Sequence, residues 1–157
     1  MYSLIKNVTI EDEIALITLY NLNASSNSIY ELFKNCEKLS LNVDMISKTA
    51  PLGSYVNLSF TVPQDSMPKI LSLTSKYKDD NNGFSTKVNL GNSKITFSGD
   101  KLKYSIGVCA TVFSIFAKAK ADIKIITTSD NEISCLTDSS SINLLSEIIK
   151  NEFGFDV

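Results

Sequence analysis

Apolar residues recur at helical spacing in four segments of the chain. In each segment they follow steps of three and four residues, which places them on one face of a helix. Such a helix has one face to bury against the rest of the protein. The four sets are Ile29, Leu32, Phe33 and Cys36; Met67, Ile70, Leu71 and Thr74; Val108, Val112, Ile115, Phe116 and Ala119; and Ile142, Leu145, Ile148 and Ile149. We expect Asp65, just after Pro63, to cap the second helix.

Between these segments, apolar and polar residues alternate, which is typical of strands covered on one face only. The pattern is plainest at residues 55–62, and Leu41, Val43 and Met45 alternate in the same way. Asn81, Asn82 and Gly83 predict a turn before a further strand at Phe84–Leu90.

The predicted elements occur twice. Ile17 corresponds to Ile95 at an offset of 78, Asn42 to Asp122 at 80, and Ser59 to Ser134 at 75. A period this long indicates two copies of one unit that reads strand, helix, strand, strand, helix.

With a closing strand, each unit is βαββαβ, and the fold class is α+β: two ferredoxin-like units with antiparallel sheets and both helices on one face. The second copy lacks its closing strand, because little chain follows its last helix. We expect Leu4–Ile10 to cross over and supply it. The predicted domains are therefore residues 13–91, and residues 92–157 completed by the strand within 1–12.

Composition limits the partners and the compartment. The chain has 157 residues, a net charge of −2 and only lysine as its basic residue, so nucleic acid is not an expected partner. The longest apolar stretch, residues 106–121, contains two lysines, so neither a membrane span nor a signal peptide is expected. Three widely spaced cysteines, Cys36, Cys109 and Cys135, predict reduced, buried thiols and a cytoplasmic protein.

The residues that usually carry catalysis are missing. The chain has no histidine, which removes the common hydrolase triads and most catalytic zinc sites. Its six glycines are dispersed and form no phosphate-binding loop. We expect no catalytic site, no metal and no cofactor.

Two stretches carry a resemblance to a known family. LNVDMISKTAPLGSYVNLSFTVPQDSMPKILSL in the first copy and IKIITTSDNEISCLTD in the second resemble the tandem ACT domains at the C-terminus of aspartate kinase, and the likeness covers nearly the whole chain. It implies a regulatory region that binds an end-product amino acid, threonine or lysine, and controls a kinase domain in cis or in trans. It also implies a homodimer. The chain is either a C-terminal fragment of such a kinase or a separate regulatory chain.

The sequence departs from the family at one key turn. Where members usually have Asp-x-Pro-Gly before the first helix, this chain has Ala24, Ser25, Ser26 and Asn27, whereas the second copy keeps a glycine, Gly107. Lys124 stands where many lysine-sensitive relatives have an acid, so it is expected to oppose a bound lysine. A neutral effector such as threonine is therefore ranked above lysine.

The resemblance places the effector between the turn of the first copy and the end of the second strand of the second copy. Helix-start N–H groups and hydroxyls would bind its carboxylate, and backbone carbonyls with Asp130 or Asp44 would bind its ammonium group. The expected effector-binding residues are Asn23, Ser25, Ser26, Asn27, Ser28, Asp44, Lys48, Ile126, Thr127, Thr128, Ser129 and Asp130.

Each feature also has a purely structural interpretation. The turn can be a helix cap, Asp44 and Lys48 can be surface charges, and residues 127–129 can be ordinary strand residues. A free-standing ACT sensor or adaptor with another small ligand or partner is the alternative function.

Overall fold

Strands and helices alternate along the chain in the predicted order. The computed structural model describes residues 4–80, 83–100 and 102–154. The elements are β1 (Asn7–Asn23), α1 (Ser26–Lys38), β2 (Ile46–Lys48), β3 (Tyr55–Pro63), η2 (Gln64–Ser66), α2 (Met67–Thr74), β4 (Ser85–Ser98), η3 (Leu102–Tyr104), α3 (Val108–Ala119), β5 (Ile125–Thr128), β6 (Glu132–Asp138), η4 (Ser139–Ser141) and α4 (Ile142–Phe153).

Two compact units divide the chain. The first is Ile14–Leu90, called here the 14–90 unit, and the second consists of the described parts of Met1–Glu13 and Gly91–Val157, called here the 91–154 unit. The hydrogen-bonded strand order is β2-β3-β1-β4-β6-β5, and β1 and β4 each contribute residues to both units. The α+β fold with antiparallel strands and four helices agrees with the prediction.

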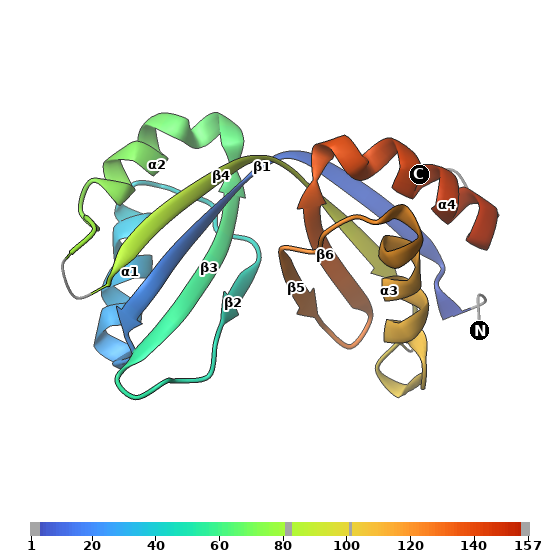
Figure 1. Cartoon of the computed structure of the whole chain (residues 1–157), viewed down its shortest axis with the longest axis horizontal. Helices are drawn as coiled ribbons and strands as arrows, with labels where there is room; N and C mark the ends of the chain where they lie inside the picture. Colours follow the sequence, from blue (N-terminus) through green and yellow to red (C-terminus); the bar gives the residue numbers. More distant parts are fainter. Residues whose placement is uncertain (1–3, 81–82, 101, 155–157) are drawn as a thin grey trace. The chain divides into compact units, whose positions relative to one another are not determined.

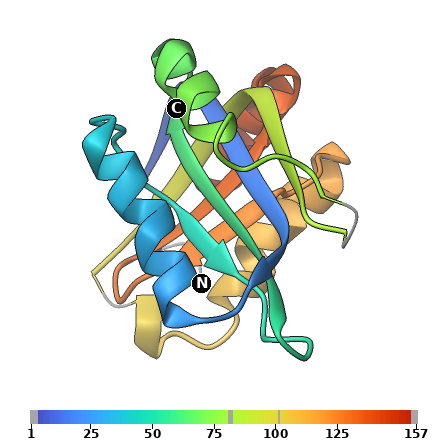
Figure 2. The same ribbon diagram turned by 90° about the vertical axis from the view of Figure 1, so that its left-hand side faces the viewer.

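In the 14–90 unit, α1 and α2 cover the same face of the sheet (Figures 1 and 2). Leu32 of α1 and Ile70 of α2 are fully buried in one core with Ile17 and Phe60, which pair directly across β1 and β3. Phe33 packs edge-to-face on Phe60, with ring centroids 5.7 Å apart. The apolar faces of the two helices and the apolar face of the sheet thus pack together in a single layer.

The 91–154 unit repeats this arrangement with α3 and α4 (Figure 1). Phe97 of β4 contacts Phe116 of α3 and Phe153 of α4 edge-to-face, both at 6.4 Å between centroids. Ile5 and Val8 of the N-terminal segment are buried in the same core, and the Lys6 amide donates to the Ser98 carbonyl at 2.8 Å. The exact boundaries of the two ACT domains stay a prediction.

Two pairs of strands that the sequence pattern separates are single strands. The predicted Leu4–Ile10 strand and the strand after it are joined in β1, and Phe84–Leu90 continues into the next strand as β4. Glu13 and Gly91, which lie at the two joins, adopt left-handed φ values of 57° and 71°. At these two residues the backbone departs from regular strand geometry without ending the strand, as at a β-bulge.

Local predictions fail at two further places. Asp65 does not cap α2: it lies in η2, and the N-cap residue Ser66 makes no side-chain cap bond within the described chain. The Leu41–Met45 segment has the predicted alternating burial but no regular strand, and β2 begins only at Ile46. The pairing is irregular there: Thr61 exchanges backbone bonds with Asp44 and Met45 at 3.1 and 3.0 Å, while the Met45 amide donates to the Thr61 Oγ1 at 2.9 Å.

The cysteines are only partly as predicted. All three are free, and Cys36 and Cys135 are buried, but Cys109 is exposed. Cys109 follows Val108 by one residue on α3 and therefore lies about 100° around the helix from the buried stripe.

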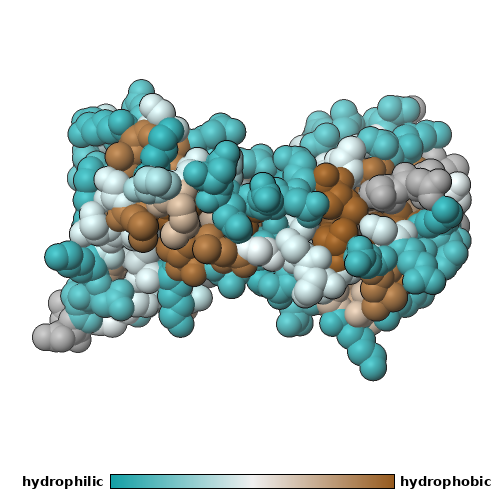
Figure 3. Space-filling view, turned by 90° about the horizontal axis from the view of Figure 1, so that it is seen from above, coloured by the Kyte–Doolittle hydropathy of each residue, from teal (hydrophilic) through white to brown (hydrophobic). Residues whose placement is uncertain are grey.

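Large apolar side chains also lie at the surface of each unit (Figure 3). They include Ile106, which is 97% exposed, and Ile126, which is 41% exposed, in the 91–154 unit. In the 14–90 unit they are Tyr20, Tyr30, Ile46, Leu52, Tyr55, Leu71 and Leu90.

Candidate functional site

The turn before α1 bonds mainly to itself. Ser25 is the N-cap residue, and its Oγ accepts from the Ser28 amide at 3.2 Å and lies 2.9 Å from the Ser28 Oγ. The Ser25 amide donates to the Asn23 Oδ1 at 2.9 Å. Two of the N–H groups expected to hold an effector carboxylate are therefore already used, and the turn has the geometry of a helix cap. Ser26 and Asn27 form the first exposed turn of α1.

Asp44 precedes β2 and Lys48 ends it, in the 14–90 unit. The Asp44 amide donates to the Thr61 carbonyl at 3.1 Å, and the Lys48 ammonium donates to the Thr49 carbonyl at 3.1 Å. Both side chains are exposed. These contacts agree with the interpretation of Asp44 and Lys48 as surface charges near an edge strand.

The start of α3 differs from that of α1 although both occupy the same place in the repeat. Gly107 is the N-cap residue and adopts φ 87°, a conformation that favours glycine, and no side chain of the described residues caps the helix. The Thr111 amide closes the first turn by donating to the Gly107 carbonyl at 3.0 Å. Among the described residues, no side chain caps the N–H groups at the start of α3.

A pocket of about 250 Å³ lies beside this helix start in the 91–154 unit. It is lined by Leu102, Ser105, Val108, Cys109, Thr128, Ser129 and Ile133. The pocket thus brings together the loop before α3, the first turn of α3 and the end of β5. The lining residues that the structure describes are uncharged, with hydroxyl and thiol groups beside apolar side chains, as small-molecule sites often have.

Two of the predicted residues, Thr128 and Ser129, line this pocket. They are held by a tight β5–β6 turn in which the Ser129 amide donates to the Glu132 carbonyl at 2.9 Å and the Asn131 amide donates to the Ser129 Oγ at 3.3 Å. Ile126, Thr127 and Asp130 belong to the same hairpin and do not line the pocket.

The remaining lining residues could have been found from the repeat. Residues 102–109 of the second copy correspond to the turn and helix start that were selected in the first copy. The family turn indicated the first copy instead, so the expected effector-binding residues did not include Leu102, Ser105, Val108, Cys109 and Ile133. Residues 23–28, 44 and 48 lie in the 14–90 unit and residues 126–130 in the 91–154 unit. A single site formed by both groups stays a prediction.

Lys124 has a partner that the sequence argument did not foresee. Its ammonium group donates to the Asp138 Oδ1 at 2.6 Å and to the Asn92 Oδ1 at 2.7 Å. It precedes β5, whereas Thr128 and Ser129 are at the other end of that strand, about 13 Å away at roughly 3.3 Å per residue. A neutralised charge at this distance has little effect on a ligand in the pocket.

Two of the three cysteines are unsuited to nucleophilic catalysis. Burial raises the pKa of the Cys135 thiol to about 12, and burial outweighs a backbone hydrogen bond to raise that of Cys36 to about 11. Neither thiol forms a thiolate nucleophile near neutral pH. Within the described ranges, no cluster of three or more acidic or cysteine side chains could hold a metal ion, and no helix is long and apolar enough to cross a membrane.

Comparison with known proteins gives a consistent family signal. The family model described as "ACT domain" matches residues 95–153. The aspartokinase of Bacillus sp. (strain MGA3) is 25% identical over 149 residues, which are 95% of this chain and 36% of that protein. The chain therefore spans about a third of the length of this curated relative.

Solved structures share the fold over almost the whole chain. The regulatory subunit of aspartate kinase from Thermus thermophilus, in a ligand-free form, superposes with a TM-score of 0.81 at 20% identity, covering 96% of this chain and 99% of that one. A structure of aspartokinase alpha and beta subunits gives 0.83 at 21% identity, covering 96% and 99%. Escherichia coli aspartokinase III, solved in complex with lysine and aspartate, gives 0.70 at 18% identity, covering 96% of this chain and 33% of that one.

Proposed function

We propose that this chain, which is an ACT-domain regulatory region of the aspartokinase kind, senses an end-product amino acid and controls an aspartate kinase catalytic domain, in cis or in trans, in the cytoplasm. The observation that supports it most is the uncharged pocket beside α3, at the place in the ACT repeat where the first helix starts and the second strand ends.

We place the effector carboxylate at the first turn of α3, whose N–H groups have no side-chain cap among the described residues. A helix N-terminus stabilises an anion through these groups and through the helix dipole. Thr128 and Ser129 line the same pocket, and their hydroxyl groups can donate to the same ligand. The corresponding turn before α1 is a weaker candidate, because Ser25 and Asn23 already occupy its donors.

The lining favours a neutral effector side chain. None of the described lining residues carries a charge that would compensate the ammonium group of a bound lysine side chain. Ser105, Thr128 and Ser129 instead offer hydroxyls that match the hydroxyl of threonine. Threonine therefore ranks above lysine for a reason independent of Lys124.

Calorimetric titration of the full chain with threonine and with lysine tests this assignment. Threonine should bind, and Thr128→Val should weaken binding by at least about tenfold, since it removes a hydroxyl and keeps the shape of the side chain. Thr9→Val, an exposed threonine on β1, is the matched control and should leave binding unchanged. Tight lysine binding that neither Thr128→Val nor Asp130→Ala alters would overturn both the ranking and the site.

The alternative function, a free-standing ACT sensor or adaptor for a different partner, is distinguished by adding the chain to an aspartate kinase catalytic domain. The activity of the kinase should change with effector concentration. If the effector site and the kinase active site are linked, the coupling free energy between them should be about 1–3 kcal/mol. Effector binding without any change in kinase activity would favour the adaptor.

A further inference from the structure

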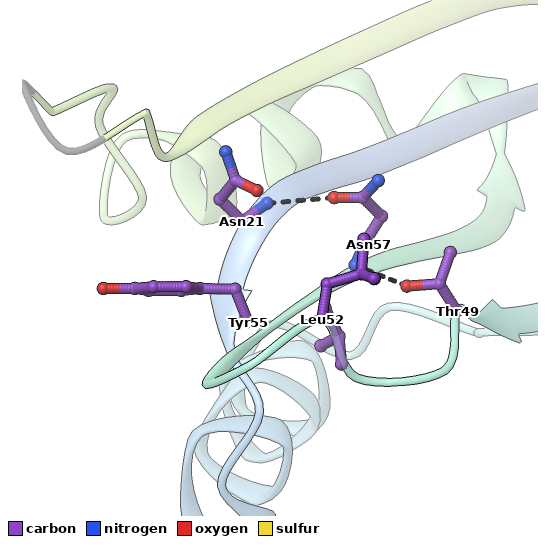
Figure 4. A pocket seen from close by; sticks show the side chains of 6 residues that line it. Asn21, Thr49, Leu52, Tyr55 and Asn57 are labelled. Atoms are coloured by element: carbon purple, nitrogen blue, oxygen red, sulfur yellow. Dashed lines mark hydrogen bonds between the residues drawn. The ribbon is translucent and has the colours of Figure 1, made fainter.

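A second pocket, of about 100 Å³, lies in the 14–90 unit and is lined by Asn21, Thr49, Leu52, Tyr55, Val56 and Asn57 (Figure 4). It is formed by the C-terminal end of β1, the start of β3 and the loop that follows β2. Val56 is buried in the core, so its neighbours Tyr55 and Asn57 lie on the face of the sheet that the helices do not cover.

Backbone bonds fix the orientation of both asparagine amides. The Asn21 backbone N–H donates to the Asn57 Oδ1 at 3.0 Å, and the Asn21 Nδ2 donates to the Gly83 carbonyl at 2.8 Å (Figure 4 shows the first bond). A backbone N–H can only donate and a carbonyl can only accept, so neither amide can be turned over. In the part of the chain that the structure describes, the Asn57 Nδ2 and the Asn21 Oδ1 have no hydrogen-bond partner.

Irregular backbone holds these groups in place. Asn21 adopts φ 53°, and the register of β1 against β3 shifts between Leu19 and Leu22. Asparagine tolerates this left-handed conformation better than most residues, although it still costs free energy. On the other side, Thr49 and Asn57 exchange bonds: the Asn57 amide donates to the Thr49 Oγ1 and the Thr49 amide to the Asn57 carbonyl, both at 3.0 Å.

Two asparagines that line the pocket therefore carry one donor group and one acceptor in fixed orientations, and none of the described lining residues is charged. A carboxylate could accept from the Asn57 Nδ2, but its second oxygen would face the Asn21 Oδ1, which is also an acceptor. An ammonium group could donate to the Asn21 Oδ1, but it cannot accept from the Asn57 Nδ2. A carboxamide satisfies both, with its oxygen toward Asn57 and its nitrogen toward Asn21. The volume has room for roughly three water-sized groups, which is the number of heavy atoms in a carboxamide.

We propose that this pocket is a binding site for the carboxamide end of a small molecule, with asparagine as the representative ligand. The charged amino and carboxylate groups of the ligand remain in water outside the pocket, and its aliphatic carbon lies against Tyr55 and Leu52. This site is separate from the effector pocket beside α3 and does not depend on the function proposed for that pocket.

The test is nuclear magnetic resonance titration of the isotope-labelled full chain with asparagine and with aspartate, which have the same shape and differ in the amide. Asparagine should shift the amide signals of Asn21, Thr49 and residues 55–57, and aspartate should bind at least about tenfold more weakly. Asn57→Asp keeps the acceptor for the Asn21 N–H but removes the donor, so it should weaken asparagine binding by a similar factor.

Asn143→Asp, an exposed position on α4, is the matched control and should leave the titration unchanged. Equal responses to asparagine and aspartate, or a response that survives Asn57→Asp, would overturn the proposal. So would the absence of any shift up to roughly 50 mM ligand, where even a millimolar dissociation constant would saturate the site. Shifts confined to residues 102–109 and 128–133 would assign asparagine to the effector pocket and would likewise contradict it.

Discussion

Single residues distinguish the two copies of the ACT fold at the start of their first helices. Ser25 caps α1 with its own hydroxyl, whereas α3 begins at the left-handed Gly107 and has no side-chain cap within the described chain. The sequence showed this difference, because it lost glycine in one copy and kept it in the other. It could not show that Ser25 and Asn23 would occupy the donors, since that depends on side-chain geometry.

Gly99 is expected to tolerate no side chain. A Cβ at this position would lie 1.9 Å from the Leu4 carbonyl oxygen, so the backbone of the N-terminal segment would have to move. Gly99→Ala should lower the free energy of unfolding by about 2–3 kcal/mol. Gly154→Ala is the control: its Cβ meets no atom within 4 Å, and only the φ of 78° opposes it, at about 1 kcal/mol. Urea denaturation that ranks the two variants in the reverse order would contradict the close approach.

The thiols should differ sharply in reactivity. In the native protein an alkylating reagent should modify Cys109, which is exposed, and leave Cys36 and Cys135 unmodified until the protein unfolds. Mass spectrometry before and after denaturation measures this, and Cys109→Ser should abolish the native reaction. Modification of Cys36 in the native protein would contradict the buried position of its thiol.

Stability should fall at alkaline pH for the same reason. Burial raises the pKa of Cys36 from 9.0 to about 11 and that of Cys135 from 9.0 to about 12. Above pH 9 the unfolded chain releases these protons while the folded chain retains them, so rising pH favours unfolding. Urea midpoints should decrease between pH 9 and 11, and less so in Cys36→Ala relative to its own value at pH 8. A flat profile would contradict the raised pKa values.

At the scale of elements, periodicity predicted the helices and most strands because each has one apolar face. Burial of Leu32, Ile70, Val112 and Leu145 follows the stripes directly. The joins at Glu13 and Gly91 could not be predicted, since a left-handed residue inside a strand looks like a turn in the sequence. The short β2 also could not be predicted, because the Thr61 side chain accepts a hydrogen bond from the Met45 backbone amide.

The N-terminal segment should contribute to the core of the 91–154 unit. Ile5 is 3% exposed and packs in the same cluster as Phe97 and Phe116. Ile5→Ala should therefore cost about 2–5 kcal/mol of unfolding free energy, the usual range for a buried aliphatic side chain. Thr9→Ala on the exposed side of β1 should change stability by less than about 0.5 kcal/mol.

Deletion of residues 1–10 provides the larger version of this test. It should destabilise or aggregate the protein, because a neighbouring strand would lose its hydrogen-bond partner and become an edge. A deletion variant that melts like the parent chain would show that this segment is dispensable.

At the scale of the whole molecule, the proposed regulatory role is supported by the fold and the relatives, whereas the proposed site depends on geometry. Thr128 and Ser129 were predicted from the family pattern, and the pocket that they line also contains residues from the loop before α3. The sequence cannot show which of several hydroxyl-bearing segments meet in space. It also left the Asn21 and Asn57 pair unnoticed, because two separate asparagines on neighbouring strands form no motif.

The chain is expected to form a homodimer. The strand order ends at β2 and β5, and each of these edge strands carries a large exposed aliphatic residue, Ile46 and Ile126, at 47% and 41% exposure. Exposed apolar edges are usually paired with another chain or protected by charge.

Light scattering should measure a particle of twice the monomer mass of 17.3 kDa. The protein concentration should be on the order of tens of micromolar, which is high enough to populate a dimer with a micromolar dissociation constant. Lysine at the pairing edge, by Ile126→Lys or by the matched Ile46→Lys, should restore the monomer. A 17.3 kDa particle for the parent chain would contradict the dimer, and a dimer that survives both substitutions would show that the edges are not its interface.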